Sequence, residues 1–248
     1  MKLSIIVPVL NSHEIVRRQL LHFKRMSLPG DVEILYIDDG SDPPIEDTIG
    51  LDRLSIYQTN DTRPWTWALA RNKGARLARG EYLLMTDLDY IIPEKTVHFV
   101  REFTGQYMGF RREFGVLDAD GNFTQDKETL LAYGLSPERY ETKGTLLPAH
   151  TNNFALKRDL FFAMGGYVED RVGKPYPQGE DNNWRKKRGR WQKAGKLILL
   201  EDKLRPTLYM FPNGQWCGDV DYNPFGLFHT LSRKTENNYW YKHPNVTR

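Results

Sequence analysis

Two aspartates separated by one residue follow an apolar run in EYLLMTDLDYIIPE, residues 81–94. A carboxylate at the end of a buried strand costs free energy unless a cation or a hydrogen-bond donor compensates its charge. Asp87 and Asp89 are therefore candidates to hold Mg²⁺ or Mn²⁺, which could in turn neutralise a diphosphate. A solvated turn is the alternative for any Asp-x-Asp sequence, and Asp118 and Asp120 illustrate it in a predicted hairpin turn.

Two other apolar runs also end in polar residues. The segment LSIIVPVLN carries Pro8 and Asn11 near its end. In VEILYIDDGSD the apolar part is followed by Asp38 and Asp39, which suit hydrogen bonds from a base or ribose. Ligands of open α/β sheets bind beyond the carboxyl ends of the strands, so we expect these groups to meet at one edge. No G-x-G-x-x-G or G-x-x-x-x-G-K-[ST] sequence occurs. The pattern predicts a nucleoside-diphosphate site built without a phosphate loop.

The elements that must position these residues alternate between strand and helix. β-Branched or apolar runs predict strands at 3–10, 32–39, 54–60 and 81–87. Val16, Leu20 and Phe23 recur at helical spacing, Asn11 and Ser12 could cap that helix, and a second helix is predicted at 66–78. This alternation predicts a parallel sheet with helices on both faces.

The second half of the chain has a different pattern. It predicts a helix at 94–104, a hairpin that turns at Asp120, a strand and helix within 151–170, a basic helix at 180–195 and a strand at 196–202. The tail from 212 is rich in Asn, Trp and Tyr with little periodicity. Because no low-complexity linker interrupts the chain, we expect one folded unit.

Composition excludes several classes of protein. Among 248 residues, Lys and Arg number 35 against 32 Asp and Glu, which by itself does not indicate a polyanionic partner. The single cysteine, Cys217, allows neither a disulfide framework nor a cysteine-based zinc site. No 18-residue apolar stretch predicts a membrane span, so we expect a cytoplasmic location.

Five segments carry a resemblance to a known family. SIIVPVLN, ILYIDDGSD, ARNKGARLARGEYLLMTDLD, NNFALKRDLFFAMGGY and GED occur in the order and spacing of glycosyltransferase family 2, over residues 2–200. The resemblance implies a GT-A fold, an α/β architecture whose Rossmann-like, mostly parallel central sheet is flanked by helices, with a small acceptor-side subregion. It implies a nucleotide-sugar-binding half at 1–94, an acceptor-binding and catalytic half at 95–211, and a tail at 212–248 that packs near the site.

The resemblance also implies an activity. Such an enzyme transfers a sugar, with inversion, from a nucleoside-diphosphate sugar, here expected to be UDP-linked, to a hydroxyl of a saccharide or other acceptor in polysaccharide or glycoconjugate synthesis. The expected cofactor is Mn²⁺ or Mg²⁺. Carried over residue by residue, Pro8 and Asn11 line the nucleoside pocket, Asp39 meets the base with Arg71 and Asn72 beside it, Asp87 contacts the ribose, and Asp89 binds the metal.

A second acidic pair, Glu180 and Asp181, matches the family's catalytic site. Direct displacement needs a carboxylate that takes the proton of the acceptor hydroxyl. By resemblance Asp181 is that base and Glu180 orients the acceptor. The alternative is that both are helix N-terminal acids stabilised by the helix dipole.

The third metal ligand departs from the family pattern. Relatives often carry a histidine after the strand that follows the Glu-Asp helix, but here RPTLYMF ends in Met210 and Phe211. His229 is the nearest downstream candidate.

The run RKKRGR, residues 185–190, carries five positive charges between Trp184 and Trp191. It is either a solvated helix face or a surface for an acidic or lipid-linked acceptor, which leaves peripheral membrane association open. A nucleic-acid acceptor is a further alternative, but the small net charge argues against it.

Two alternatives come from other functional classes. One is a nucleotide-sugar-binding subunit without turnover. The other is a nucleotidyltransferase, which usually has a glycine-rich N-terminal loop that VPVLNSHE lacks.

Overall fold

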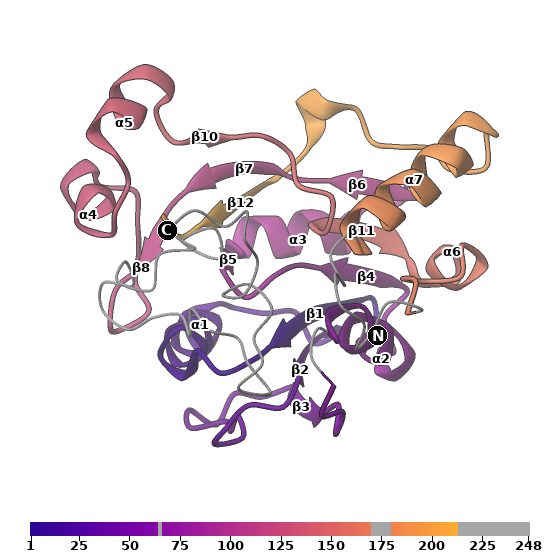
Figure 1. The fold of residues 1–248 in the computed structure, drawn as a ribbon, viewed down its shortest axis with the longest axis horizontal. Helices are drawn as coiled ribbons and strands as arrows, with labels where there is room; N and C mark the ends of the chain where they lie inside the picture. Colours follow the sequence, from indigo (N-terminus) through magenta and orange to yellow (C-terminus); the bar gives the residue numbers. More distant parts are fainter. Residues whose placement is uncertain (64–65, 170–179, 213–248) are drawn as a thin grey trace.

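A computed structural model describes residues 1–63, 66–169 and 180–212 (Figure 1). Its strands are β1 (Leu3–Val9), β2 (Val32–Asp38), β3 (Leu54–Gln58), β4 (Tyr82–Met85), β5 (Tyr90–Ile91), β6 (Tyr107–Gly109), β7 (Arg111–Phe114), β8 (Val116–Leu117), β9 (Phe123–Thr124), β10 (Leu146–Leu147), β11 (Phe154–Lys157) and β12 (Thr207–Met210). Its helices are α1 (His13–Arg25), α2 (Trp67–Leu77), α3 (Glu94–Glu102), α4 (Lys127–Ala132), α5 (Pro137–Lys143), α6 (Arg158–Ala163), α7 (Glu180–Lys193) and the 3₁₀ turn η1 (Asp202–Leu204).

The main sheet has six strands in the order β3-β2-β1-β4-β11-β6. Strands β3, β2, β1 and β4 are parallel, as predicted, and β11 runs antiparallel between β4 and β6. Every residue of β1 is buried. A strand covered on both faces explains why the continuous apolar run, rather than an alternating one, forms β1.

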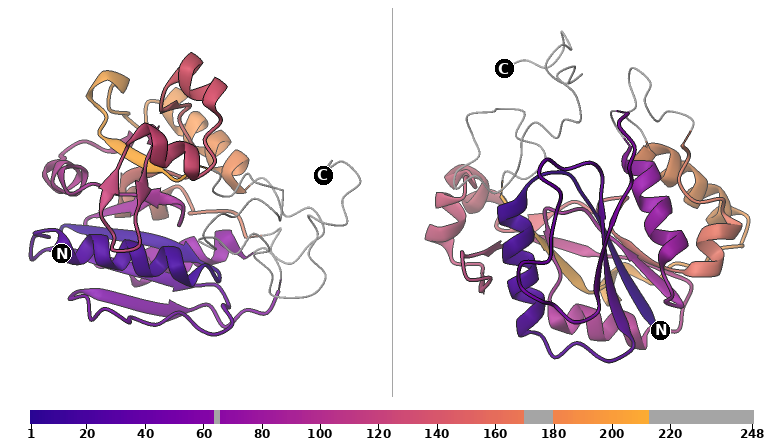
Figure 2. Two further views of the ribbon diagram at one scale, coloured as in Figure 1. Left: turned by 90° about the vertical axis from the view of Figure 1, so that its left-hand side faces the viewer. Right: turned by 90° about the horizontal axis from the view of Figure 1, so that it is seen from below.

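Helices cover both faces of this sheet, and alternate residues of β1 belong to different cores. Ile5 packs in a cluster with Leu20 of α1, whereas Ile6 packs in a second cluster with Ala70 of α2. Figure 2 shows α1 and α2 on opposite sides of the strands. A Cβ at Gly74 of α2 would lie 2.5 Å from Ile6 Cγ2, so the glycine allows α2 to approach the sheet closely.

A second sheet is built mainly from the second half of the chain, in the order β10-β7-β12-β5. β6 of the main sheet leads into β7 through the single residue Phe110, so one extended segment joins the two sheets. Strands β8 and β9 form the predicted hairpin, where Asp118 accepts hydrogen bonds from the backbone of Asp120 and Asn122 at 2.9 and 2.8 Å. Asp118 therefore closes a turn.

The strand predicted at 196–202 is wrong. This segment makes an isolated bridge between Leu199 and Tyr107 and then enters η1. The backbone N–H of Ile198 donates instead to Gln106 Oε1 at 2.7 Å, and the Ile198 side chain is 68 % exposed. The segment therefore makes one isolated bridge to the edge of the sheet and forms no strand. Across the described residues, no helix is long and apolar enough to cross a membrane.

Candidate functional site

The carboxyl ends of β1, β2 and β4 meet at one edge of the main sheet, as the sequence predicted. Asp39 donates its backbone N–H to Val9 O at 2.7 Å just beyond β2, and Thr86 donates to Ile6 O at 3.3 Å just beyond β4. Pro8 lies in register with Ile37, beyond the last β1–β4 pair, so its missing N–H interrupts no ladder there. These ends bring the polar residues of three separate segments together.

Asn11 fixes the loop after β1 against the loop after β2. Its backbone N–H donates to Ser41 Oγ at 2.7 Å, and its Oδ1 accepts from the Asp42 N–H at 2.9 Å. Asn11 and Ser12 both have left-handed backbones, with φ of 54° and 61°. Ser12 precedes α1 but makes no side-chain capping bond, so the predicted cap is wrong. The Asn11 amide joins the two loops.

The two adjacent aspartates after β2 have different roles. Asp38 accepts from the backbone N–H groups of Ser41 at 2.8 Å and Ile45 at 3.0 Å, which shapes the loop. The buried Asp39 carboxylate accepts from Thr59 Oγ1 at 2.9 Å and Thr66 Oγ1 at 2.5 Å. Asp39 is thus oriented by two hydroxyls at the strand edge.

Arg71 of α2 joins the first aspartate of the Asp-x-Asp pair to the second acidic pair. Its side chain is 3 % exposed, and it forms an ion pair with Asp87. Arg71 Nη1 also lies 3.8 Å from Glu180 Oε1, although the two residues are far apart in the sequence. One guanidinium therefore connects the end of β4 with the start of α7.

Glu180 and Asp181 form the first turn of α7. Burial raises the pKa of the Glu180 carboxyl, and the positive charge of Arg71 opposes that shift. Asp181 Oδ1 accepts from the Asn182 N–H at 2.7 Å, which orients the carboxylate at the helix start. Two carboxylates in different environments thus lie at one end of a helix, an arrangement suited to general acid–base chemistry.

Asn72 uses its amide to hold the segment after α6. Its Oδ1 accepts from the Tyr167 N–H at 2.9 Å, and its Nδ2 donates to Tyr167 O at 2.9 Å and to Glu169 Oε1 at 2.6 Å. The Tyr167 ring lies beneath Arg71, whose Cζ is 5.4 Å from the ring centroid. Asn72 therefore supports Arg71 through Tyr167.

His150 belongs to the site and was missed by the sequence reasoning. Its Nδ1 lies 3.7 Å from Asp87 Oδ2, and it lies 3.4 Å from Asn153 Nδ2. Antiparallel pairing of β11 with β4 brings the residues before Phe154 next to the residues after Met85. The segment His-Thr-Asn-Asn before a short apolar run was the available signal, but only the strand direction makes it informative.

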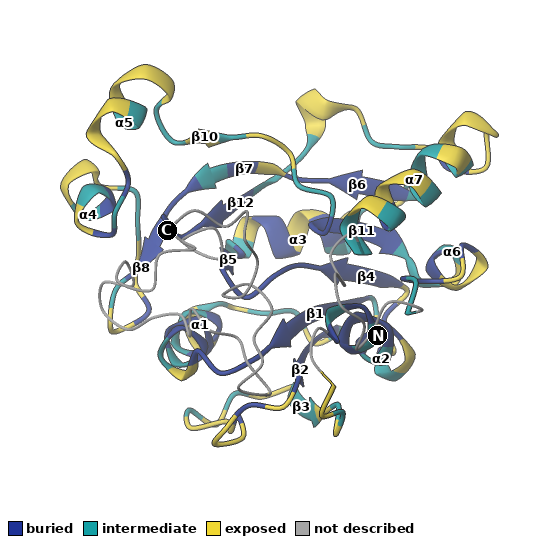
Figure 3. Cartoon of the chain, viewed as in Figure 1, coloured by how far each residue is buried: buried dark blue, intermediate teal, exposed yellow. Residues whose placement is uncertain are grey.

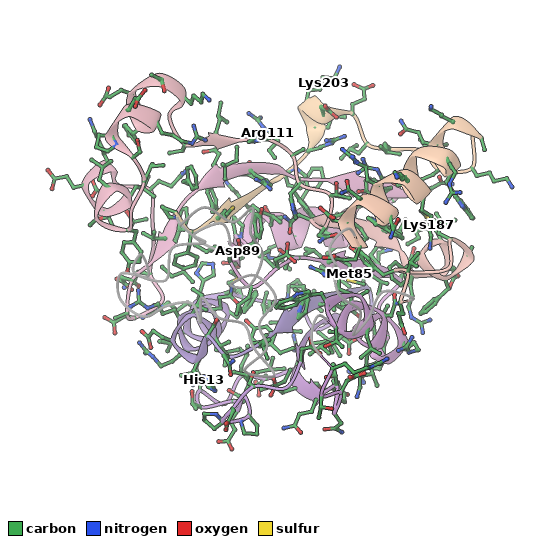
Figure 4. All side chains as sticks on the ribbon, viewed as in Figure 1. His13, Met85, Asp89, Arg111, Lys187 and Lys203 are labelled. Atoms are coloured by element: carbon green, nitrogen blue, oxygen red, sulfur yellow. The ribbon has the colours of Figure 1, made fainter. Side chains whose placement is uncertain are left out.

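Asp89 is the residue that the sequence predicted as a ligand of a divalent cation. Its side chain is buried between the two sheets near the centre of Figure 4, and its carbonyl accepts from the Phe211 N–H at 3.1 Å. The strand end expected to carry a histidine is therefore beside Asp89, but Met210 and Phe211 stand there, and both are buried. His229 lies outside the described residues.

The described residues contain no cluster of three His, Cys, Asp or Glu side chains that could enclose a metal. Mg²⁺ commonly binds through one or two carboxylates together with substrate phosphates and water. A single carboxylate such as Asp89 fits that mode of binding, and Asp87 forms an ion pair with Arg71.

The basic stretch of α7 is partly structural. Lys187 Nζ donates to the carbonyls of Gly165 and Gly166, and Arg188 Nη1 donates to the Tyr107 hydroxyl at 3.0 Å. Lys186 and Arg190 are exposed. Two of the five charges therefore anchor the helix, which neither sequence interpretation of this run anticipated.

Comparisons with known proteins concern the family and the fold of the chain. The model of the family described as glycosyl transferase family 2 matches residues 4–161. No curated protein matches the chain. Among solved structures, S. aureus TarS 1–349 is similar with a TM-score of 0.52 and 19 % identity, over 85 % of this chain and 60 % of that one.

Two similar structures contain ligands. TarS 1–349 in complex with UDP-GlcNAc has a TM-score of 0.52 and 19 % identity, covering 86 % of this chain and 59 % of that one. A mannosyltransferase from Pyrobaculum calidifontis, in complex with GDP-Man and Mn²⁺, has a TM-score of 0.52 and 18 % identity, covering 86 % and 57 %. This chain thus spans about three fifths of the length of these structures, and at such identity the similarity establishes the fold.

Proposed function

This chain belongs to glycosyltransferase family 2 and has a GT-A fold, and on that premise we propose that it transfers a sugar, with inversion, from a UDP-linked donor to a hydroxyl acceptor. The observation that carries the proposal is the contact of Arg71 with both Asp87 and Glu180. It ties a carboxylate on the nucleotide side to one on the acceptor side. Such a coupling suits a reaction in which both substrates are held at once.

The acceptor side supplies the proton transfer. We assign Asp181 as the general base that accepts the proton of the attacking hydroxyl, and Glu180 as the group that orients the acceptor. The bond from the acceptor oxygen to the anomeric carbon forms as the bond from that carbon to the diphosphate breaks. The electron pair of the broken bond leaves with the nucleoside diphosphate, and attack from the opposite face inverts the anomeric centre.

The donor side supplies binding and charge. We assign Asp39, Pro8 and Asn11 to the nucleoside, and Asp87 to the ribose. Asp89 would hold Mn²⁺ or Mg²⁺, which when bound stabilises the negative charge of the leaving diphosphate. The UDP and GDP-sugar ligands of the neighbouring structures support a nucleotide-sugar donor but not a choice of base.

A thermal-shift series tests this proposal. UDP- and GDP-sugars are added with Mn²⁺, with Mg²⁺ or with EDTA, and donor hydrolysis is measured for any that bind. One donor at a hundred times its Kd should stabilise the protein by about 2.7 kcal/mol, or roughly 5–11 °C in Tm. Absence of stabilisation by every donor would contradict the proposal.

A nucleotide-sugar-binding protein without turnover is the second candidate. The observation that favours it is that Met210 and Phe211, beside Asp89, stand at the strand end where a histidine is expected. Donor hydrolysis separates the two candidates, because a binding protein would be stabilised by the donor without consuming it.

A further inference from the structure

Arg112 of β7 is a buried cation without a counter-ion. Arg112 is 8 % exposed, yet no carboxylate in the described ranges forms an ion pair with its guanidinium. Its Nε is buried and has no hydrogen-bond partner among these residues. Because arginine cannot shed its proton in a protein, burial of an unpaired guanidinium is unfavourable. Arg71, the other buried arginine nearby, has Asp87 as its partner.

Among the described residues, the Arg112 guanidinium contacts the face of an aromatic ring. Its Cζ lies 5.4 Å from the centroid of the Tyr90 ring. A ring face attracts the positive charge but leaves the planar fork of N–H donors unused. This fork matches a carboxylate or a phosphate in two parallel hydrogen bonds. The Tyr90 contact therefore orients Arg112 and leaves its donors available for an anion.

Arg112 lies near residues of the candidate site. Tyr90 directly follows Asp89, and strand β12 holds both residues of the contact in register, pairing with Arg112 at Leu208 and with Tyr90 at Met210. Burial lowers the pKa of His150, where Asp87 opposes the shift and Arg112 adds to it. Arg112 therefore lies beside Tyr90, the residue that follows the Asp-x-Asp pair.

We propose that Arg112 binds an anionic group, a phosphate or a carboxylate, on the acceptor; this rests on the proposed glycosyl transfer. On the donor side, Arg71 already pairs with Asp87, and Asp89 is assigned to a cation. Arg112 is instead on the second sheet, on the strand that continues from β6. Helix α7, which begins with Glu180 and Asp181, packs on β6 through Arg188 and Tyr107.

The outer face of α7 also carries positive charge. Lys186, Arg190 and Lys193 are exposed and spaced to lie on one side of the helix. Residues 182–200 contain no aspartate or glutamate. Figure 3 shows exposed residues along this helix and η1. An acceptor with repeated anionic groups would meet Arg112 near the reacting hydroxyl and the α7 cations farther along.

The test measures anion binding separately from donor binding. Protein saturated with UDP or GDP, whichever binds, and Mn²⁺ is titrated with sn-glycerol 3-phosphate and with neutral glycerol by ligand-observed NMR. Arg112→Met removes the charge at similar volume, and Arg112→Lys keeps the charge without the fork. Arg111→Met is the matched control, because Arg111 is the exposed neighbour on the same strand (Figure 4).

We expect wild type and Arg111→Met to bind glycerol 3-phosphate and not glycerol. Arg112→Met should weaken that binding about tenfold or more, the scale of a lost charge-assisted hydrogen bond, with Arg112→Lys in between. Nucleotide affinity should be the same in all four proteins. Equal glycerol 3-phosphate affinity in wild type and Arg112→Met, or no such binding by wild type, would overturn the proposal.

Two further outcomes are distinguishable. A tenfold loss of nucleotide affinity in Arg112→Met would assign the arginine to the donor diphosphate and overturn its role toward the acceptor. Failure of wild type to bind any nucleotide would refute the proposed function. Titration of the nucleotide-free proteins with glycerol 3-phosphate would then decide whether Arg112 binds anions at all. Urea unfolding of each variant establishes that it is folded under the conditions of the titration.

Discussion

Replacing Arg71 by Met should destabilise the protein strongly, because it leaves buried carboxylates without their cation. The Asp87 side chain is 6 % exposed, and the Glu180 side chain, at 3.8 Å from the guanidinium, is 22 % exposed. Breaking a buried ion pair by removing one partner costs about 3–5 kcal/mol. Since Glu180 is partly screened by solvent, we place the loss near the lower end, about 3 kcal/mol. For a chain of this size that corresponds to a Tm lower by about 6–12 °C.

The loss should depend on pH. Burial already holds the pKa of Glu180 above its ordinary value, and removal of Arg71 raises it further. The folded state then binds more protons than the unfolded state between the ordinary pKa and the raised one, so stability falls as pH rises through that window. The deficit of the Arg71→Met variant should therefore be largest at neutral pH and smaller at pH values near the ordinary pKa of a carboxyl.

Urea unfolding at neutral and mildly acidic pH measures both effects. Arg76→Met on the same helix is the control, because Arg76 is 57 % exposed and 3.7 Å from Glu169, a pair whose loss should cost no more than about 1 kcal/mol. The double variant with Asp87→Asn should recover part of the loss. An Arg71→Met midpoint equal to that of wild type, or a double variant whose losses simply add, would refute the assignment of Arg71 as the cation that compensates Asp87.

Three other predictions concern the site and the basic helix. Asp89→Asn should abolish Mn²⁺-dependent binding of the nucleoside diphosphate in a calorimetric titration, while the free energy of unfolding stays within about 1 kcal/mol of that of wild type. Unchanged Mn²⁺ dependence would contradict the role of Asp89 as the metal ligand. Asp181→Asn should keep donor affinity and lower kcat about a hundredfold or more in a transfer assay, and full turnover would exclude it as the base. Substituting Lys186, Arg190 and Lys193 together by Gln should lower the salt dependence of binding to a polyanionic acceptor without changing donor hydrolysis, whereas equal salt dependence would show that the α7 face is only solvated.

The cations of α7 fall into two groups that only the structure separates. The run 185–190 suggested that all of its charges act alike. Lys187 and Arg188 instead hold α7 against Gly166 and Tyr107, so their replacement would disturb the helix as well as any acceptor surface. Hydrogen bonds between distant segments separate the two groups of charges, and composition carries no such information.

The sequence alone determined the architecture of the first half of the chain. Continuous apolar runs and helical periodicity are properties of neighbouring residues, so β1, β2, β4, α1 and α2 could be predicted from them, and parallel strands bring their carboxyl ends to one edge. The same local pattern failed at 196–202, where the backbone makes only an isolated bridge to Tyr107 and the Ile198 N–H donates to the Gln106 side chain.

Only the tertiary structure decided which polar residues act together. Asp38 and Asp39 are equivalent by pattern, yet one closes a loop and the other faces the threonines. His150 reaches Asp87 because β11 runs antiparallel to β4, and Arg112 remains without a counter-ion because no acidic side chain of the described ranges folds against it. Burial and ion pairing depend on the register and packing of segments far apart in the chain, whereas hydrophobic periodicity is written into adjacent residues.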